Sequence, residues 1–173
     1  MARANYLAQG RPDIQYATKE LCRKMSDPGE EYMKRLKRLG RYLLGTPRTR
    51  LWYASEEKQH NVCIWTESNF AGCKRIRKST SGGIAVIGTH CIKSWSTTQD
   101  VIALSSGEAE LYALVKGACH GIVLRSLMKD FGQHVSLNIH TDASAAKGIV
   151  SRRGIGRVRH IEVSELWIQY LVR

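Results

Sequence analysis

The stretch Val62-Cys-Ile-Trp-Thr-Glu-Ser-Asn-Phe-Ala-Gly72 decides the fold that we predict for this chain of 173 residues. Its first five residues have high strand propensity and lead into a carboxylate, Glu67, which small and turn-forming residues follow. Apolar side chains occupy both alternating positions, so we predict a central strand with both faces covered. A carboxylate at the end of such a strand is costly to leave in apolar surroundings. We therefore expect Glu67 to cap a helix, bind a metal or take part in chemistry, unless it is simply a surface acid.

The residues before this strand predict two helices. One pattern begins at Arg11-Pro-Asp13 and breaks at Ser26-Asp-Pro-Gly29, and a second helix runs over about residues 30–44. This second helix has an apolar stripe, and basic residues cover the rest of its surface. Those basic residues are compatible with either a solvated face or a nucleic-acid contact. We also predict a short strand at Leu51–Tyr53.

The residues after the strand predict a meander of strands and then a long helix. Ser105 and Ser106 provide N-cap chemistry for that helix, which is apolar nearly all round and therefore buried. The predicted elements, in chain order, are strands at Gly82–Gly88 and Cys91–Trp95, a helix over Gly107–Phe131, a strand at Val135–Thr141, a helix over Ala143–Val150 and a helical stretch at Ile161–Val172.

The net charge of +12, with a sequence pI near 9.8, predicts attraction to polyanions, among which nucleic acid is the commonest. A basic surface that only keeps the protein in solution is the alternative. The charge is clustered, which favours nucleic acid. Five basic residues lie in Lys34–Arg41, four in Lys74–Lys78 and four in Arg152–Arg159.

The remaining composition narrows the class of protein. The five cysteines are widely spread and form no CxxC pair, so we expect neither a zinc site nor a disulfide framework. We find no apolar run of about 20 residues and no secretory signal, and we expect no membrane span. These features favour an intracellular location, in the cytoplasm or nucleus.

Four carboxylates form a candidate constellation. Two predicted strands end in acids, Glu67 and Asp142, and the long helix opens with Glu108 and Glu110. Three carboxylates that meet at the end of a sheet repel each other unless a cation lies among them, and Mg2+ is held by a few such oxygens. Two such ions can activate a water and stabilise the leaving oxygen of a phosphodiester. An acid cluster on a basic chain therefore predicts metal-dependent hydrolysis of nucleic acid.

Each acid has an alternative role. Asp142 is a favoured N-cap residue for the helix that follows it, and Glu108 suits a capping box with Ser105. Glu108 and Glu110 lie about 200° apart on a helix, so only one of them can point into a given site. Periodicity leaves open which of the two it is.

Five motifs along the chain resemble those of the ribonuclease H domain in copia-type retrotransposon Pol polyproteins, in the same order. The N-terminal part resembles the segment that joins the reverse transcriptase to that domain. The matching stretches are Thr66-Glu-Ser-Asn-Phe-Ala-Gly72 (family Ser-Asp-Ala-Asp-Trp-Ala-Gly), Arg77-Lys-Ser-Thr-Ser-Gly-Gly83 (Arg-Lys-Ser-Thr-Ser-Gly), Ala103-Leu-Ser-Ser-Gly-Glu-Ala-Glu-Leu-Tyr-Ala-Leu114 (Leu-Ser-Ser-Thr-Glu-Ala-Glu-Tyr), His140-Thr-Asp-Ala-Ser-Ala-Ala146 (Cys-Asp-Asn-Gln-Ser-Ala) and Arg159-His-Ile-Glu162 (Lys-His-Ile-Asp).

The resemblance implies an α/β, RNase H-like mixed sheet, with three antiparallel strands and then a parallel strand, flanked by helices. It implies a helical connection segment over residues 1–50 and an RNase H-like domain over residues 51–173. It also implies that Glu67, Glu110 and Asp142 are the catalytic acids, that they hold Mg2+ or Mn2+, and that the substrate is the RNA strand of an RNA–DNA hybrid during reverse transcription. Ser105 and Ser106 would meet the minor groove of the hybrid, where 2′-hydroxyls mark RNA. The residues expected to bind nucleic acid are Lys74, Arg75, Arg77, Lys78, Ser105, Ser106, Arg152, Arg153, Arg157 and Arg159.

The chain departs from the family at three points. Glu67 and Asn69 stand where the family has Asp, and an extra methylene moves a carboxylate by roughly 1.5 Å, which can cost about 100-fold in rate. The family's fourth acid and fifth strand lie beyond Arg173, and we expect both to be missing, with a sheet edge left for a reverse transcriptase domain or another protein to cover. A catalytically degenerate remnant, acting as a nucleic-acid-binding or structural subunit, is therefore the alternative function.

Overall fold

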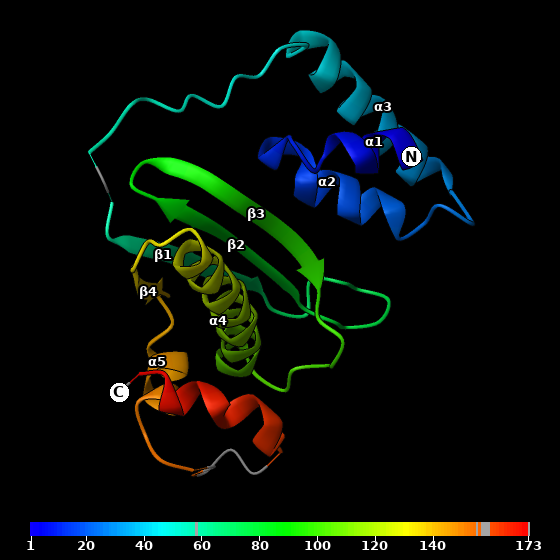
Figure 1. Cartoon of the computed structure of the whole chain (residues 1–173). Coiled ribbons are helices and arrows are strands. Elements are labelled where there is room, and N and C mark those ends of the chain that lie inside the picture. The colour runs from blue at the N-terminus through cyan, green and yellow to red at the C-terminus, as the bar shows by residue number, and fades with distance from the viewer. Residues whose placement is uncertain (58, 155, 157–159, 173) are drawn as a thin grey trace. The chain divides into compact units, whose positions relative to one another are not determined.

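The computed structural model of the chain describes residues 1–57, 59–154, 156 and 160–172 (Figure 1). These residues divide into two compact units. The first, here called the helical unit, consists of Met1–Trp52 together with Trp95–Thr97. The second, here called the sheet unit, consists of the rest of the chain.

The helical unit contains α1 (Ala2–Leu7), α2 (Pro12–Cys22) and α3 (Glu30–Gly45). Pro12 occupies the start of α2, where its missing N–H costs no hydrogen bond. The apolar stripe of α3 faces α1 and α2, so the amphipathic pattern of the sequence is used as predicted. The buried core of the unit consists of Ala8, Ile14, Leu21 and Leu39, with Tyr32, Leu36 and Leu43 packed against it.

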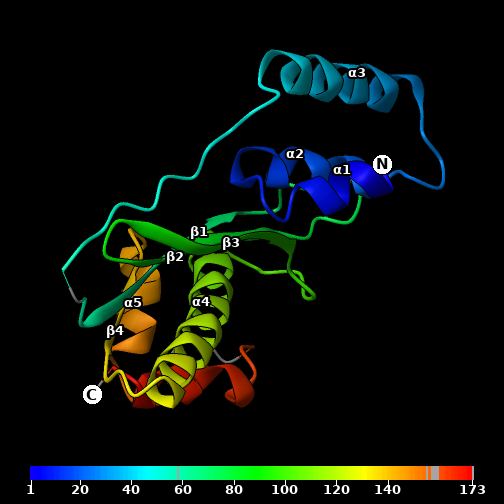
Figure 2. The same cartoon turned by 45° about the horizontal axis from the view of Figure 1, so that its top comes forward.

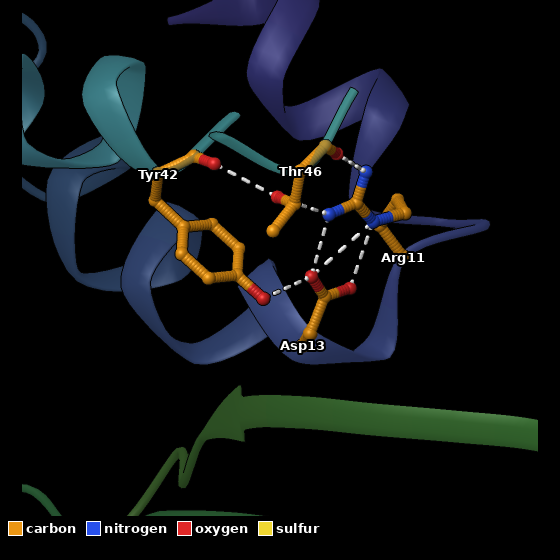
Figure 3. A network of polar contacts seen from close by, with 4 residues as sticks. All are labelled: Arg11, Asp13, Tyr42 and Thr46. Atoms are coloured by element: carbon orange, nitrogen blue, oxygen red, sulfur yellow. Dashed lines mark hydrogen bonds and ion pairs between the residues drawn. The ribbon is translucent and has the colours of Figure 1, made fainter. Parts of the chain in front are cut away.

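A polar network joins the start of α2 to the end of α3 (Figure 3). Arg11 donates to both oxygens of Asp13, and its shortest contact, from Nη2 to Oδ2, is 2.7 Å. Arg11 also donates to the carbonyl and the hydroxyl of Thr46. Tyr42 donates its hydroxyl to Asp13 Oδ2 at 2.8 Å. These bonds fix where α2 begins relative to where α3 ends.

The sheet unit is built on β1 (Asn61–Asn69), β2 (Thr80–Ile87), β3 (His90–Thr98, of which Trp95–Thr97 is counted with the helical unit) and β4 (Ser136–His140). The strand order is β3-β2-β1-β4, and β1 pairs antiparallel with β2 and parallel with β4. A tight turn, which contains Gly88 at φ +60°, connects β2 to β3. The parallel strand β4 follows a crossover through the long helix α4 (Ser106–Asp130), as parallel pairing requires.

Helix α4 lies against one face of the sheet (Figure 2). Two glycines allow the close approach. A Cβ on Gly117 would lie 2.4 Å from Thr66 Cγ2, and one on Gly121 would lie 2.5 Å from a Leu137 methyl group. Helix α5 (Ser144–Val150) and a 3-10 helix over Val163–Tyr170 complete the unit. One cluster of buried apolar residues in this unit contains Leu111, Leu114, Val115, Ala118, Ile149, Val150, Ile161, Leu166 and Ile168.

This arrangement confirms the predicted fold class, a mixed RNase H-like sheet of three antiparallel strands and one parallel strand flanked by helices. Three local predictions are wrong. The central strand does not stop at Glu67, because pairing with β2 continues to Asn69. The face of β1 opposite α4 is not fully covered, since Trp65 is 53% exposed and stacks on His140. Residues 51–53 form no strand, and their side chains are exposed.

One helix among the described residues, α4, is long and apolar enough to cross a membrane when only length and composition are considered. The sequence analysis found no such run. The finding is weak evidence for a membrane span, because a helix in the core of a folded domain passes the same test and α4 packs on the sheet.

Candidate metal centre

Three carboxylates from separate elements meet at one edge of the sheet. Glu67 lies near the end of β1, Glu110 lies in the second turn of α4, and Asp142 follows β4. One oxygen from each lies within 4.8 Å of the others. Parallel pairing of β1 with β4 explains part of this convergence. Trp65 pairs with His140, and Glu67 and Asp142 each lie two residues beyond these paired residues. The structure thus brings together the three acids that the resemblance indicated.

Glu110 is the buried member of the cluster, with 8% of its surface exposed. Its Oε1 accepts hydrogen bonds from the backbone N–H of Ser68 at 3.0 Å and from Ser68 Oγ at 2.7 Å. Its Oε2 is buried and has no hydrogen-bond partner. A buried carboxylate oxygen without a donor is unfavourable. A cation between the three acids would satisfy it, so these residues fit a hard divalent ion.

The electrostatics of Glu110 agree with this geometry. Burial raises the pKa of Glu110 above its ordinary value, and the charges of Glu67 and Asp142 raise it further. The two hydrogen bonds from Ser68 lower this pKa and oppose the shift in part. The protein therefore holds the charged form of the cluster at a cost, which a bound cation would relieve.

Glu67 and Asp142 are exposed, and within the described part of the chain neither carboxylate accepts a hydrogen bond or forms an ion pair. Asp142 does not cap the following helix, because the N-cap of α5 is Ala143 and no side chain caps it. The capping role that the sequence left open for Asp142 is thus not observed. As far as the described residues go, no partner within the chain occupies either carboxylate.

Glu108 has a different role from Glu110, although both are buried. Ser105 Oγ accepts from the N–H of Glu108 at 3.2 Å, and Glu108 Oε2 accepts from the N–H of Leu104 at 2.8 Å. The Glu108 carboxylate also accepts from the Tyr112 hydroxyl and lies 2.8 Å from His160 Nε2. Glu108 therefore secures the start of α4 in the manner of a capping box. This contact pattern settles the question that helical periodicity left open.

Ser68 is a site residue that the sequence analysis missed. Its two hydrogen bonds hold one oxygen of Glu110, and the other oxygen is buried without a hydrogen-bond partner. No local pattern signals this role, because Ser68 and Glu110 are 42 positions apart. The register of α4 on β1 creates the contact.

The two serines at the start of α4, Ser105 and Ser106, are exposed, as a surface that meets a nucleic acid requires. Ser105 is the N-cap, and Ser106 is the first residue of the helix. The cap bond to Glu108 occupies the Ser105 hydroxyl as an acceptor and leaves its proton available to another partner.

The basic loop between β1 and β2 presents three exposed cations, Lys74, Arg75 and Arg77. Lys78 differs from them, because it is half-buried and donates to the backbone oxygen of Asp100. Arg77 has a φ of +57°, in the left-handed region, and its N–H donates to the Cys73 carbonyl at 2.7 Å. The loop is thus a closed turn that carries cations on its outer side.

The second predicted basic cluster follows α5. Arg152 is half-buried and Arg153 is exposed. Arg157 and Arg159 lie outside the described residues. Among the residues that the structure describes, no cation forms an ion pair with Glu67, Glu110 or Asp142. The acid cluster is therefore not neutralised by the described part of the protein.

Comparison with known proteins gives relatives that include retrovirus-related Pol polyproteins of transposons. The chain is 34% identical over 127 residues, 73% of its length, to a retrovirus-related Pol polyprotein from transposon RE1 of Arabidopsis thaliana, of which it covers 9%. It is 28% identical over 94% of its length to a retrovirus-related Pol polyprotein from transposon TNT 1-94 of Nicotiana tabacum, of which it covers 12%. It is 34% identical over 60% of its length to secreted RxLR effector protein 161 of Plasmopara viticola, of which it covers 72%. The chain thus spans about a tenth of the polyproteins. No family model matches it.

Proposed function

Because this chain belongs to the family that includes the retrovirus-related Pol polyproteins of transposons, we propose that it is a ribonuclease H domain of retroelement origin. Its reaction is the metal-dependent hydrolysis of the RNA strand in an RNA–DNA hybrid. It works beside other domains of a polyprotein, a reverse transcriptase domain among them, inside the cell.

One observation carries this proposal. Three carboxylates lie within 4.8 Å of one another, and the buried one has an oxygen without a partner. Carboxylates brought this close repel each other, and the described chain supplies no cation to them. The arrangement is that of ligands around a hard divalent ion.

Glu67, Glu110 and Asp142 are the residues that would hold Mg2+ or Mn2+. A divalent ion held there would supply an activated water and would stabilise the charge that develops on the leaving oxygen of a phosphodiester. Glu110 presents its free oxygen from a fixed position, because Ser68 holds the other one. Glu67 and Asp142 face the cluster from the solvent-accessible side, where a phosphate can enter.

Other residues of the sheet unit suit the substrate. The exposed cations Lys74, Arg75 and Arg77 carry charge that complements a phosphate backbone. Ser105 has a hydroxyl proton available to a 2′-hydroxyl or a sugar oxygen. In this proposal the loop holds the backbone, and the serines distinguish RNA from DNA.

A second candidate function is nucleic-acid binding without cleavage. The longer side chain of Glu67, and Asn69 in place of an acid, favour it, because catalysis tolerates little displacement of a reacting or metal-holding group. The carboxylate of Glu67 nevertheless reaches the cluster. That contact is why we place hydrolysis first.

The test is cleavage of an end-labelled RNA–DNA hybrid by the purified chain in Mg2+ or Mn2+, with Asp142→Asn as the control. We expect cleavage of the RNA strand that is lost in EDTA and in the variant. A folded wild-type chain with no more cleavage than Asp142→Asn would exclude hydrolysis and leave the binding function. A DNA duplex of the same sequence tests the preference for RNA.

A further inference from the structure

The surface of α3 opposite its apolar stripe carries cations that the proposed reaction does not use. Lys37, Arg38 and Arg41 are exposed, and we call these three residues the α3 cationic face. At about 100° per residue, all three lie within about 50° of the direction opposite to the stripe of Tyr32, Leu36, Leu39 and Leu43. They form one face, therefore, and not a ring of charge around the helix.

The acids nearby are already occupied. The first 50 residues contain twelve Lys or Arg and five Asp or Glu, a net charge of +7 within the chain's +12. Each of the five acids forms an ion pair, and in every case the partner is a cation outside the α3 cationic face. In the described chain, Lys37, Arg38 and Arg41 form no ion pair or hydrogen bond.

The spacing on this face is unfavourable for the isolated protein. Lys37 and Arg41 are four residues apart, and Arg38 and Arg41 are three apart, so their side chains are neighbours on the helix surface. Like charges at these spacings repel. By contrast, Lys34 and Arg35, one turn earlier, pair with Glu30 and Glu31 at 3.0 and 3.1 Å. An external polyanion would turn the repulsion on the cationic face into attraction.

The chemistry of the face selects among polyanions. An amphipathic helix that binds an anionic membrane inserts its apolar side. Here that side forms the core of the helical unit, because Leu39 is buried and Leu36 and Leu43 pack against the core. What remains outside is mainly Lys and Arg, and the exposed apolar side chains of the helix, Met33, Tyr42 and Leu44, lie to the sides of this row. Such a row suits the regularly spaced phosphates of a nucleic acid.

We propose that the α3 cationic face is a second nucleic-acid-binding surface, which takes the phosphate backbone through Lys37, Arg38 and Arg41. It lies in the helical unit, whereas the acid cluster lies in the sheet unit. Its role is affinity and not chemistry. It goes beyond the proposed hydrolysis and does not depend on it, because a chain that cannot cleave can still bind through α3.

The test is a matched pair of double variants in the whole chain. Lys37→Gln with Arg38→Gln removes one Lys and one Arg from the cationic face. Lys34→Gln with Arg35→Gln removes the same residue types from the preceding turn, where both are ion-paired. Gln is a good helix former and all four positions are exposed, so circular dichroism should be unchanged. Lys37→Arg with Arg38→Lys keeps the charge and should bind like the wild type.

Binding of a labelled RNA–DNA hybrid is measured by fluorescence anisotropy in EDTA, where no cleavage occurs, over a series of KCl concentrations. We expect the Lys37/Arg38 variant to bind about tenfold more weakly and its plot of log Kd against log salt to lose about 2 in slope. The Lys34/Arg35 variant should lose less than about 1 in slope. A labelled single-stranded RNA shows whether the face needs a double helix.

Equal losses of hybrid affinity in the two double variants would overturn the proposal, because any exposed Lys or Arg would then contribute equally to binding. No loss in the Lys37/Arg38 variant would also overturn it. Binding to phosphatidylserine vesicles that this variant loses, with hybrid binding intact, would assign the face to a membrane instead. A chain that binds through α3 as expected, yet never cleaves the hybrid, would support this proposal and exclude hydrolysis.

Discussion

Two carboxylate networks in the described part of this protein differ in whether a cation of the chain lies beside the carboxylates. In the helical unit, Asp13 receives three hydrogen bonds from Arg11 and one from Tyr42, and these lower its pKa to about 2 (Figure 3). In the sheet unit, Glu110 has a raised pKa, because it is buried and two further acids lie beside it. The first network is complete within the protein. The second has no cation beside it among the described residues, and this difference is why we propose it as a functional site.

The largest expected effect is on the rate of hybrid cleavage, which should depend on the acid cluster and not on the network around Asp13. Glu110→Gln removes a carboxylate of the acid cluster, and we expect it to lower the rate of hybrid cleavage by at least about 100-fold, since even residues behind a metal's ligands cost 10- to 100-fold when changed. Asp13→Asn is the matched control and should leave the rate per folded molecule unchanged. The measurement is the initial rate of cleavage in Mg2+. A similar loss in both variants would show that the contrast between the networks has no catalytic meaning.

The second expected effect concerns the length of one side chain. Glu67→Asp retracts the carboxylate by roughly 1.5 Å toward β1, to the position that the family's Asp occupies, and such a displacement can change a rate by up to about 100-fold. We expect the variant to cleave faster than the wild type. The same assay with Mn2+ in place of Mg2+ checks whether the variant is again faster than the wild type. A slower variant would show that the cluster of this chain is adapted to the longer side chain.

A smaller effect is expected on stability, and the two networks should respond in opposite directions. Asp13→Asn weakens the bonds to Arg11 and should lower the free energy of unfolding by about 1 kcal/mol, because Asp13 is partly exposed and solvent screens the pair. Glu110→Gln relieves repulsion and should not destabilise the metal-free protein. Urea denaturation in EDTA measures both. Destabilisation by Glu110→Gln would mean that the acid serves the fold.

The smallest expected effect is a difference in pH dependence. The folded-state pKa of Asp13 is lowered from 3.8 to about 2, so its contribution to stability is present above pH 3.8 and is lost as pH falls toward about 2. The folded-state pKa of Glu110 is raised, so its contribution is present below 4.5 and is lost as pH rises through the raised pKa. Denaturation of each variant against the wild type over this pH range should show opposite slopes. Slopes of the same sign for the two variants would contradict the opposite pKa shifts of Asp13 and Glu110.

The fold was predictable because its signals are local or carried by motifs. Strand propensity placed β1, and the apolar pattern placed α4 to within a residue at each end. The resemblance supplied the order of the motifs and the three acids. The end of β1 was not predictable, because pairing with β2 carries the strand past Glu67 to Asn69. Likewise, no pattern within Leu51–Tyr53 reveals that this apolar segment lacks a partner strand.

The details of the acid cluster depend on contacts between distant residues. Helical spacing separates Glu108 from Glu110 but does not say which faces the sheet. The structure answers through the bonds of Glu108 to Ser105 and Leu104 and those of Glu110 to Ser68. Gly117 and Gly121 set how closely α4 approaches β1 and β4. Such contacts follow from packing, which residue type and spacing alone do not encode.

We propose that Glu67, Glu110 and Asp142 together hold a divalent cation. Isothermal titration of the metal-free protein with Mn2+ tests it most directly, with Glu110→Gln and Glu108→Gln as a matched pair two residues apart on α4. We expect the wild type and Glu108→Gln to bind Mn2+ and Glu110→Gln to bind it at least about 100-fold more weakly. Equal binding by Glu110→Gln and the wild type, or no binding by a folded wild type, would contradict the claim.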